Sequence, residues 1–199
     1  GLLKTRRELE PARDELATIE AVADDQRTPE QRERLAALKA TIAPLDAAYE
    51  DLQTRLADFL TLGINDFPTS AETKAGLRIY AEEAMVNASE RVTRAGDYKK
   101  AIDELQTAKG YFEAASLPVH QPLLDLEARF EDLRFITQER FDQIKKGMTR
   151  DDVRGIAGTP YYRNVSDIPD RKVIRWLYPK RDGGAAAVYF KMDTGKVFD

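Results

Sequence analysis

The chain has 199 residues, of which 33% are charged and 42% hydrophobic, and it contains no cysteine. Many of the apolar residues are alanine and glycine is scarce, a composition that favours helix over sheet. The lack of cysteine excludes disulfides, thiol catalysis and cysteine-ligated metal sites within these residues. No uncharged apolar run approaches the roughly 20 residues of a membrane-spanning helix.

Charge is unevenly distributed along the chain. Residues 137–199 contain 13 Lys and Arg against 9 Asp and Glu, whereas the rest of the chain contains 18 basic and 26 acidic residues. The net charges are therefore +4 and −8, which predicts two parts with different surfaces. Neither value reaches the strongly basic footprint of a nucleic-acid-binding domain, so no nucleic-acid partner is expected.

A heptad repeat of apolar residues predicts a coiled-coil helical hairpin over residues 1–62. Thr28 suits the N-cap of the second helix, Pro29 its first position and Gln31 the far side of a capping box. This seam could also be satisfied between chains, as a homo-oligomer. A weaker repeat marks the first helix, at Leu9, Ala12, Leu16, Ile19 and Ala23. The repeat of the second helix alternates steps of three and four residues: Leu35, Leu38, Ile42, Leu45, Tyr49, Leu52, Leu56 and Phe59.

Two prolines lie inside the hairpin helices. Pro11 and Pro44 are each expected to kink or break their helix, because proline removes a backbone hydrogen bond and clashes with the preceding turn. Their mean position falls in the predicted turn, so the two kinks would lie at the same height in the hairpin. The alternative is that residues 1–11 are a frayed terminus.

A linker is predicted over residues 61–68. Gly63 would end the second helix, and Pro68 would precede the next one. Thr69 and Glu72 have the spacing of a capping box, which predicts that a third helix begins there and continues to Gly96.

The region 69–136 is predicted to be helical and resembles one tetratricopeptide repeat (TPR). The resemblance lies in a tight turn at Gly96, a helix cap at Asp97, and a following helix with small residues at Ala101 and Ala108. A solenoid of such repeats needs about three copies, and only one occurs. An ordinary antiparallel helix pair is therefore the simpler interpretation, whereas a TPR-like groove would bind peptide.

A fifth helix is predicted to begin after Pro118 and to run unbroken to Lys146, for about 37 Å at 1.5 Å per residue. Such a helix would couple the helical part rigidly to the last 63 residues, 137–199. Its apolar stripe consists of Leu126, Phe130, Leu133, Thr137, Phe141 and Ile144.

The residues after this helix predict a fixed corner between two helices. Gly147 suits a left-handed helix end. Thr149 is placed as the N-cap of a short helix with Asp152 at its third position. Met148 and Val153 have the spacing of a hydrophobic staple across that cap.

Strands are predicted after the short helix closes at Gly158, Thr159 and Pro160. Alternating residues predict strands over 172–178 and 185–192, joined by a hairpin loop at 180–184, and a short last strand at 196–198. The fold class is thus multidomain: a helical hairpin and helix bundle, followed by an α+β module with the element order ααβββ.

Residues 137–199 resemble the BamE (SmpA/OmlA) lipoprotein domain. The resemblance implies a bacterial envelope protein that binds other proteins, periplasmic or anchored to the outer membrane by a lipid. A longer helical segment precedes the domain here, and the lipid-carrying cysteine is absent; a chain that begins with Gly1 is expected to have been processed or trimmed upstream. The matching residues are Phe141, Ile144, Gly147, Met148, Thr149, Val153, Gly158, Thr159, Pro160, Trp176, Tyr178, Val188 and Phe190.

Six residues of this module are candidates for protein binding. Tyr161, Tyr162 and the loop residues Lys180 and Arg181 are the better surface candidates, because loops near a sheet edge often carry contacts. Trp176 and Tyr178 share one strand face with Ile174 and form either core or an exposed aromatic patch, of which core is the favoured interpretation.

No catalytic, cofactor-binding or metal-binding residue is predicted. The single histidine, His120, cannot form a histidine-based zinc site alone. Walker A, G-x-G-x-x-G and G-x-S-x-G motifs are absent. The acidic pairs at 24–25 and 151–152 are explained by their positions at helix ends.

These features favour a non-catalytic envelope scaffold or adaptor that binds proteins through its helical and BamE-like surfaces. The alternative is a soluble inhibitor or regulator that blocks an enzyme with the sheet face of the C-terminal module. An enzyme would need convergent carboxylates with perturbed pKa values in a pocket.

Overall fold

The computed structural model describes residues 1–198 and divides into two compact units, Gly1–Ile79 and Tyr80–Asp199. Helical elements fill the first unit, and helices followed by a three-stranded antiparallel sheet form the second. The predicted fold class, helical and then α+β, is confirmed. The division at 1–62, 69–136 and 137–199 stays a prediction. No helix within residues 1–198 is long and apolar enough to cross a membrane.

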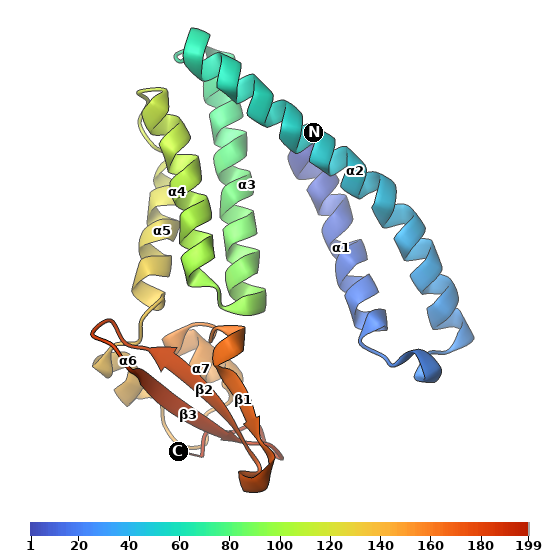
Figure 1. Cartoon of the computed structure of the whole chain (residues 1–199), viewed down its shortest axis with the longest axis vertical. Coiled ribbons are helices and arrows are strands. Elements are labelled where there is room, and N and C mark those ends of the chain that lie inside the picture. Colours follow the sequence, from blue (N-terminus) through green and yellow to red (C-terminus); the bar gives the residue numbers. More distant parts are fainter. Residues whose placement is uncertain (199) are drawn as a thin grey trace. The chain divides into compact units, whose positions relative to one another are not determined.

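The first unit contains the predicted antiparallel hairpin, built from α1 (Leu2–Glu20) and α2 (Pro29–Asp66) with the short 3-10 helix η1 (Asp24–Gln26) at the turn (Figure 1). The Thr28–Gln31 capping box forms as predicted. Within this chain, the heptad seam of α2 packs against α1 as far as Leu56, whereas the predicted seam residue Phe59 is 42% exposed. The shared core consists of Leu2, Leu9, Ile19, Leu38, Ile42 and Tyr49, with Ala12, Leu16, Leu35, Leu45, Leu52 and Leu56 partly buried against it.

Both prolines are accommodated inside continuous helices. Pro11 lies within α1 and Pro44 within α2, so neither helix is broken. The frayed-terminus alternative is wrong, because Leu2 and Leu9 are buried in the hairpin core. Apolar packing on both sides of each proline offsets the roughly 3 kcal/mol that proline costs inside a helix.

The predicted linker after α2 is wrong in detail. The helix continues through Gly63 to Asp66, and α3 (Ala71–Ala95) is capped by Ser70, whose hydroxyl oxygen accepts the Thr73 N–H at 3.0 Å. Thr69 is therefore not the cap. Gly63 is buried, and a Cβ there would lie 2.5 Å from the Thr73 hydroxyl oxygen. This glycine serves close packing of α2 against α3 instead of ending the helix.

In the second unit, the remainder of α3 is joined by α4 (Tyr98–Ala114) and α5 (Gln121–Leu133). Asp97 caps α4 as predicted, accepting the Lys100 N–H at 3.2 Å. Tyr80 of α3 packs edge-on against Tyr111 of α4, with ring centroids 4.9 Å apart. The buried residues of α4 lie on one stripe: Tyr98, Ala101, Ile102, Leu105, Ala108 and Phe112.

The predicted continuous helix to Lys146 is wrong. It ends at Leu133, and a separate short helix, α6 (Gln138–Gln143), begins after Thr137, whose hydroxyl caps it. Between them, the Ile136 N–H donates to the Pro179 carbonyl at 2.9 Å, and the Ile136 side chain is buried. The chain therefore leaves the helix because Ile136 enters the core of the sheet-containing module.

The predicted corner before α7 (Arg150–Ala157) is mostly confirmed. Thr149 and Asp152 form the capping box, and Gly147 has a positive φ of 89°. Gly147 does not end a helix, however, because α6 has already ended at Gln143. Its N–H donates instead to the Val197 carbonyl at 2.9 Å.

The sheet has the order β1 (Val165–Ile168), β2 (Val173–Pro179) and β3 (Ala185–Lys191), with both pairs antiparallel. The 3-10 helices η2 (Tyr162–Asn164) and η3 (Pro169–Arg171) flank β1. β1 was not predicted, because it is only four residues long. Residues 196–198 do not form the predicted last strand: Lys196 and Val197 make only isolated bridges.

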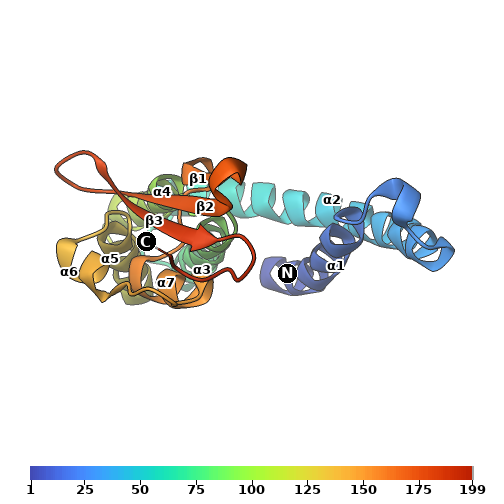
Figure 2. The same ribbon diagram turned by 90° about the horizontal axis from the view of Figure 1, so that it is seen from below.

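Helices α6 and α7 cover one face of this sheet, as Figure 1 and Figure 2 both show. In the β2–β3 register, Trp176 pairs with Val188 and Tyr178 with Ala186 on the covered face. The core on that side consists of Ile136, Val153, Ala157, Trp176, Tyr178, Ala186, Val188, Phe190 and Val197.

Candidate protein-binding cleft

Two buried tyrosines hold the loop that closes α7. The Tyr98 hydroxyl, on α4, accepts the N–H of Thr159 at 3.1 Å, and the Tyr178 hydroxyl, on β2, donates to the carbonyl of Gly158 at 3.1 Å. Gly158 has a positive φ of 80°, and a Cβ there would overlap the Tyr98 hydroxyl. The loop is thus held between the helical region and the sheet.

A second close contact joins the same two regions. Gly96, in the turn between α3 and α4, has a φ of 61°, and a Cβ there would overlap the carbonyl of Pro160. Glycine is therefore required at position 96 both for its left-handed backbone and for close approach of the two chain segments. The α3–α4 turn and the loop after α7 form one rigid junction.

A cleft of about 370 Å³ opens at this junction. Its floor is aromatic and prolyl, and its rim carries cations and carboxylates, a mixture typical of surfaces that bind other molecules. Lys99 and Lys100 are exposed in the first turn of α4, and neither has an ion pair within residues 1–198. The lining residues are Gly96, Asp97, Tyr98, Lys99, Lys100, Asp103, Leu133, Arg134, Thr159, Pro160, Tyr161, Asn164, Tyr178 and Pro179.

An aromatic pair continues the cleft onto the surface. Tyr161 lines the cleft, and Tyr162 packs edge-on against it with ring centroids 4.8 Å apart. Arg163 donates to the Tyr162 hydroxyl at 2.8 Å, which lowers the pKa of Tyr162. Tyr162 is 52% exposed, so this ring is available to a partner.

Cations and an aromatic ring also meet at the break between α5 and α6. Arg134, which lines the cleft, lies over the ring of Phe135 at 5.1 Å from the centroid, and Arg181 of the β2–β3 loop lies at 5.4 Å from the same centroid. These contacts fix the loop near the end of α5.

Two of the six predicted site residues line the cleft, and a third packs against one of them. Tyr161 and Tyr178 line the cleft, with Tyr178 as a buried part of its floor, and Tyr162 extends the cleft. Lys180 follows the lining residue Pro179 in sequence and is partly exposed.

Trp176 is separate from the cleft. It is 3% exposed and packs against Phe190 with ring centroids 4.5 Å apart. The interpretation of Trp176 and Tyr178 as core is confirmed, and an exposed aromatic patch is wrong for both, because α6 and α7 cover that sheet face.

Tyr98 is one of several cleft residues that the sequence did not identify as functional. Burial raises the pKa of both Tyr98 and Tyr178 above 10.0, so both hydroxyls stay protonated at neutral pH. In the sequence, Tyr98 stands out only as an aromatic residue directly after a helix cap. The fold shows that its hydroxyl contacts Thr159, 61 positions further along the chain.

Comparison with known families agrees with this architecture. Residues 134–194 match the family model described as outer membrane protein assembly factor BamE domain. The C-terminal module is BamE-like. No curated protein and no solved structure matches the chain significantly. The match begins at Arg134, where α5 ends and the structure turns into the sheet-containing module.

One element that the BamE-like domain uses for its own fold, the Gly158–Pro160 loop, therefore also contacts the helical region. The Gly158–Pro160 loop and β2 belong to the matched residues, whereas Tyr98 lies outside them. Within residues 1–198, no group of three or more His, Cys, Asp or Glu is arranged to hold a metal ion.

Proposed function

We propose that this protein is a non-catalytic adaptor of the bacterial cell envelope, periplasmic or anchored to the outer membrane, which binds protein partners through the cleft. The BamE-like domain supports the envelope location and the non-catalytic role. A lipoprotein-type anchor needs a cysteine, so it would lie outside these 199 residues.

The observation that carries the binding role is the composition of the cleft walls. They come from the helical region through Tyr98 and Lys99, and from the BamE-like domain through Pro160 and Tyr161. A partner seated there would contact both parts at once. Recognition would therefore differ from that of a BamE-like domain without the preceding helices.

Site-specific photocrosslinking in cells tests this proposal. The full gene product would carry a photoreactive phenylalanine analogue at position 162, where the tyrosine is 52% exposed. We expect a covalent adduct with an envelope protein after irradiation, and recovery of the protein in the envelope fraction.

The matched control places the same photoreactive residue at Thr107, which is exposed on α4 and is not part of the cleft. Equal adducts at both positions, or recovery of the protein and its adduct in the cytosol, would contradict the proposal.

The alternative, inhibition of an enzyme through the sheet, is favoured by one observation. The sheet face away from α6 and α7 carries half-exposed Arg175 and Leu177 on β2, paired with Tyr189 and Ala187 on β3. A photoreactive residue at position 189 would then capture a single enzyme, whereas position 162 would capture nothing. That pattern of adducts would support the inhibitor function and contradict the adaptor function.

A further inference from the structure

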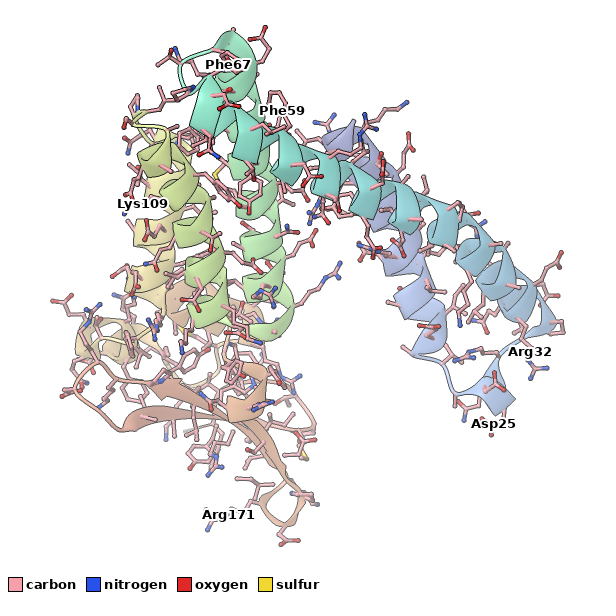
Figure 3. The ribbon with its side chains drawn as sticks, turned by 45° about the horizontal axis from the view of Figure 1, so that its top comes forward. Asp25, Arg32, Phe59, Phe67, Lys109 and Arg171 are labelled. Atoms are coloured by element: carbon pink, nitrogen blue, oxygen red, sulfur yellow. The ribbon has the colours of Figure 1, made fainter. Side chains whose placement is uncertain are left out.

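A second hollow lies at the end of the sheet remote from the cleft. The cleft includes Pro179, the last residue of β2, whereas the second hollow includes Val173, the first residue of that strand. At about 3.3 Å per residue, the two ends are roughly 20 Å apart. Figure 3 shows Arg171 at the free tip of the sheet. The hollow measures about 570 Å³ and is lined by Arg171, Lys172, Val173, Lys191, Met192, Asp193 and Phe198.

The charge of this second hollow is positive. Among the described residues, Arg171, Lys172 and Lys191 share this hollow with a single lining carboxylate, that of Asp193. Within residues 1–198, none of these three cations has an ion pair. Lys191 is exposed and lies over the ring of Phe198, with its ammonium nitrogen 5.8 Å from the ring centroid. The hollow is therefore suited to a ligand that carries negative charge.

The same hollow presents apolar surface. Val173 is buried beneath it, whereas Met192 is 36% exposed and Phe198 is 50% exposed. Adjacent large apolar side chains rimmed by charge are typical of interaction sites. A small inorganic anion would pair with the cations and leave Met192 and Phe198 in water. The fitting ligand carries both carboxylates and an apolar group.

The cations are held on a fixed backbone. Lys172 adopts a left-handed conformation with φ of 54°, which is uncommon for a residue with a side chain. Its carbonyl accepts the Met192 N–H at 3.0 Å, and Val173 pairs with Lys191 in the sheet. Both sides of the hollow are thus joined by backbone hydrogen bonds, which reduces the entropy lost when a ligand binds.

We propose that this hollow binds an acidic segment of a partner protein. Carboxylates of the segment would face Arg171, Lys172 and Lys191, and an apolar side chain would cover Met192 and Phe198. The concave shape favours a peptide segment over a flat membrane surface. Three cations are too few for the phosphate contacts of a nucleic acid. This site is independent of the cleft and of the envelope location.

Fluorescence anisotropy with the purified full chain tests the proposal. The probe is a short fluorescein-labelled peptide in which glutamates flank leucines. We expect saturable binding that weakens as NaCl screens the charges. The double variant Arg171→Glu/Lys191→Glu should weaken binding by about tenfold or more, as expected for reversed charge at an interface.

The matched control variant is Arg7→Glu/Lys74→Glu, which makes the same change in net charge at exposed positions outside the hollow. It should bind the probe within about twofold of the unchanged protein, because neither side chain lines the hollow and salt screens exposed charges that do not contact the probe. Equal loss in both variants would show nonspecific electrostatic attraction and overturn the proposal.

Two further probes separate the ligand classes. Replacing the leucines of the peptide by serine should weaken binding, as should replacing the glutamates by glutamine. Unchanged binding of either peptide would contradict the two-part site. The protein is also mixed with vesicles of equal parts phosphatidylcholine and phosphatidylglycerol. Co-sedimentation with these vesicles, without binding of the peptide, would overturn the proposal and identify a membrane surface as the ligand.

Discussion

The helical hairpin and the BamE-like domain are held together in different ways. In the hairpin, two helices adjacent in sequence bury one repeated seam. In the BamE-like domain, the core collects residues from Ile136, α7, two strands and Val197. The first arrangement depends on one period repeated along each helix. The second depends on single residues that reach the core from separate segments.

This difference determines how each region tolerates irregular residues. Pro11 and Pro44 remain inside continuous hairpin helices, because many similar contacts along the seam share the cost. Gly96 and Gly158 are not replaceable in the same way, since a Cβ at either would overlap a specific atom of another segment. A region built on a repeated pattern distributes its stability, whereas a region built on few contacts concentrates it.

The largest effect is expected in the core of the domain. Phe190 is fully buried, so Phe190→Ala should lower the free energy of unfolding by about 4 kcal/mol. Hydrogen exchange measured by mass spectrometry should show faster exchange in β2 and β3, with the hairpin unchanged. Faster exchange throughout residues 1–79 would contradict the separation of the two regions.

The corresponding change in the hairpin is Leu9→Ala, also at a fully buried position. It should cost about 3 kcal/mol, and faster exchange should be confined to α1 and α2. As control, Leu62→Ala removes a side chain that is 64% exposed and should leave the stability of the hairpin nearly unchanged.

A smaller effect is expected where the helical region meets the domain. Gly96→Ala should destabilise the second unit by about 2 kcal/mol, because alanine is strained in a left-handed backbone and its Cβ would overlap the Pro160 carbonyl. Gly110→Ala is the matched control, because open space surrounds Gly110 in α4. It should raise stability by about 0.5 kcal/mol, so chemical denaturation should move the two midpoints in opposite directions.

Tyr98→Phe isolates one hydrogen bond of that junction. Loss of the hydroxyl leaves the Thr159 N–H without its acceptor, which should cost about 1.5 kcal/mol. Because burial raises the folded-state pKa of Tyr98, its contribution is complete below about pH 10 and is lost as pH rises through the folded value. Alkaline unfolding should therefore depend less on pH in Tyr98→Phe, and an unchanged pH profile would contradict this role.

The smallest effect is expected at the cap of α7. The Thr149 hydroxyl, followed by the Thr149 N–H, lowers the pKa of Asp152 below 3.8. The stability from this carboxylate is therefore present above the unfolded pKa and is lost as pH falls through the folded value. Asp152→Asn should unfold with less dependence on pH below about pH 4, as circular dichroism would show. The same acid transition in both proteins would argue against the cap.

A structural feature could be predicted from the sequence when the contact that determines it joins residues close together in the chain. The Thr28 and Thr149 capping boxes were predictable, because each joins residues three apart. The end of α5 was not, because its apolar stripe continues past Leu133 in helical register. Only the hydrogen bond from Ile136 to Pro179 accounts for the break.

The same limit applies to the candidate site. Tyr161 and Tyr162 were identifiable from their place in a loop, and Trp176 was correctly favoured as core. β1 was missed, because an alternating pattern over four residues is too short to predict a strand. Its strand character becomes evident only from its pairing with β2. Tyr98 was not singled out, since its partner Thr159 is distant in sequence.

By itself, the sequence determined the helical hairpin, the caps of α2, α4 and α7, the two long strands and the BamE-like character of the C-terminal module. Each follows from the spacing of residues near one another in the chain. Only the tertiary structure decided where α5 ends, how Tyr98 and Tyr178 hold the Gly158–Pro160 loop, and where the two hollows lie. These features depend on hydrogen bonds and close approaches between segments that are far apart in the chain, and no repeating pattern in the sequence indicates such contacts.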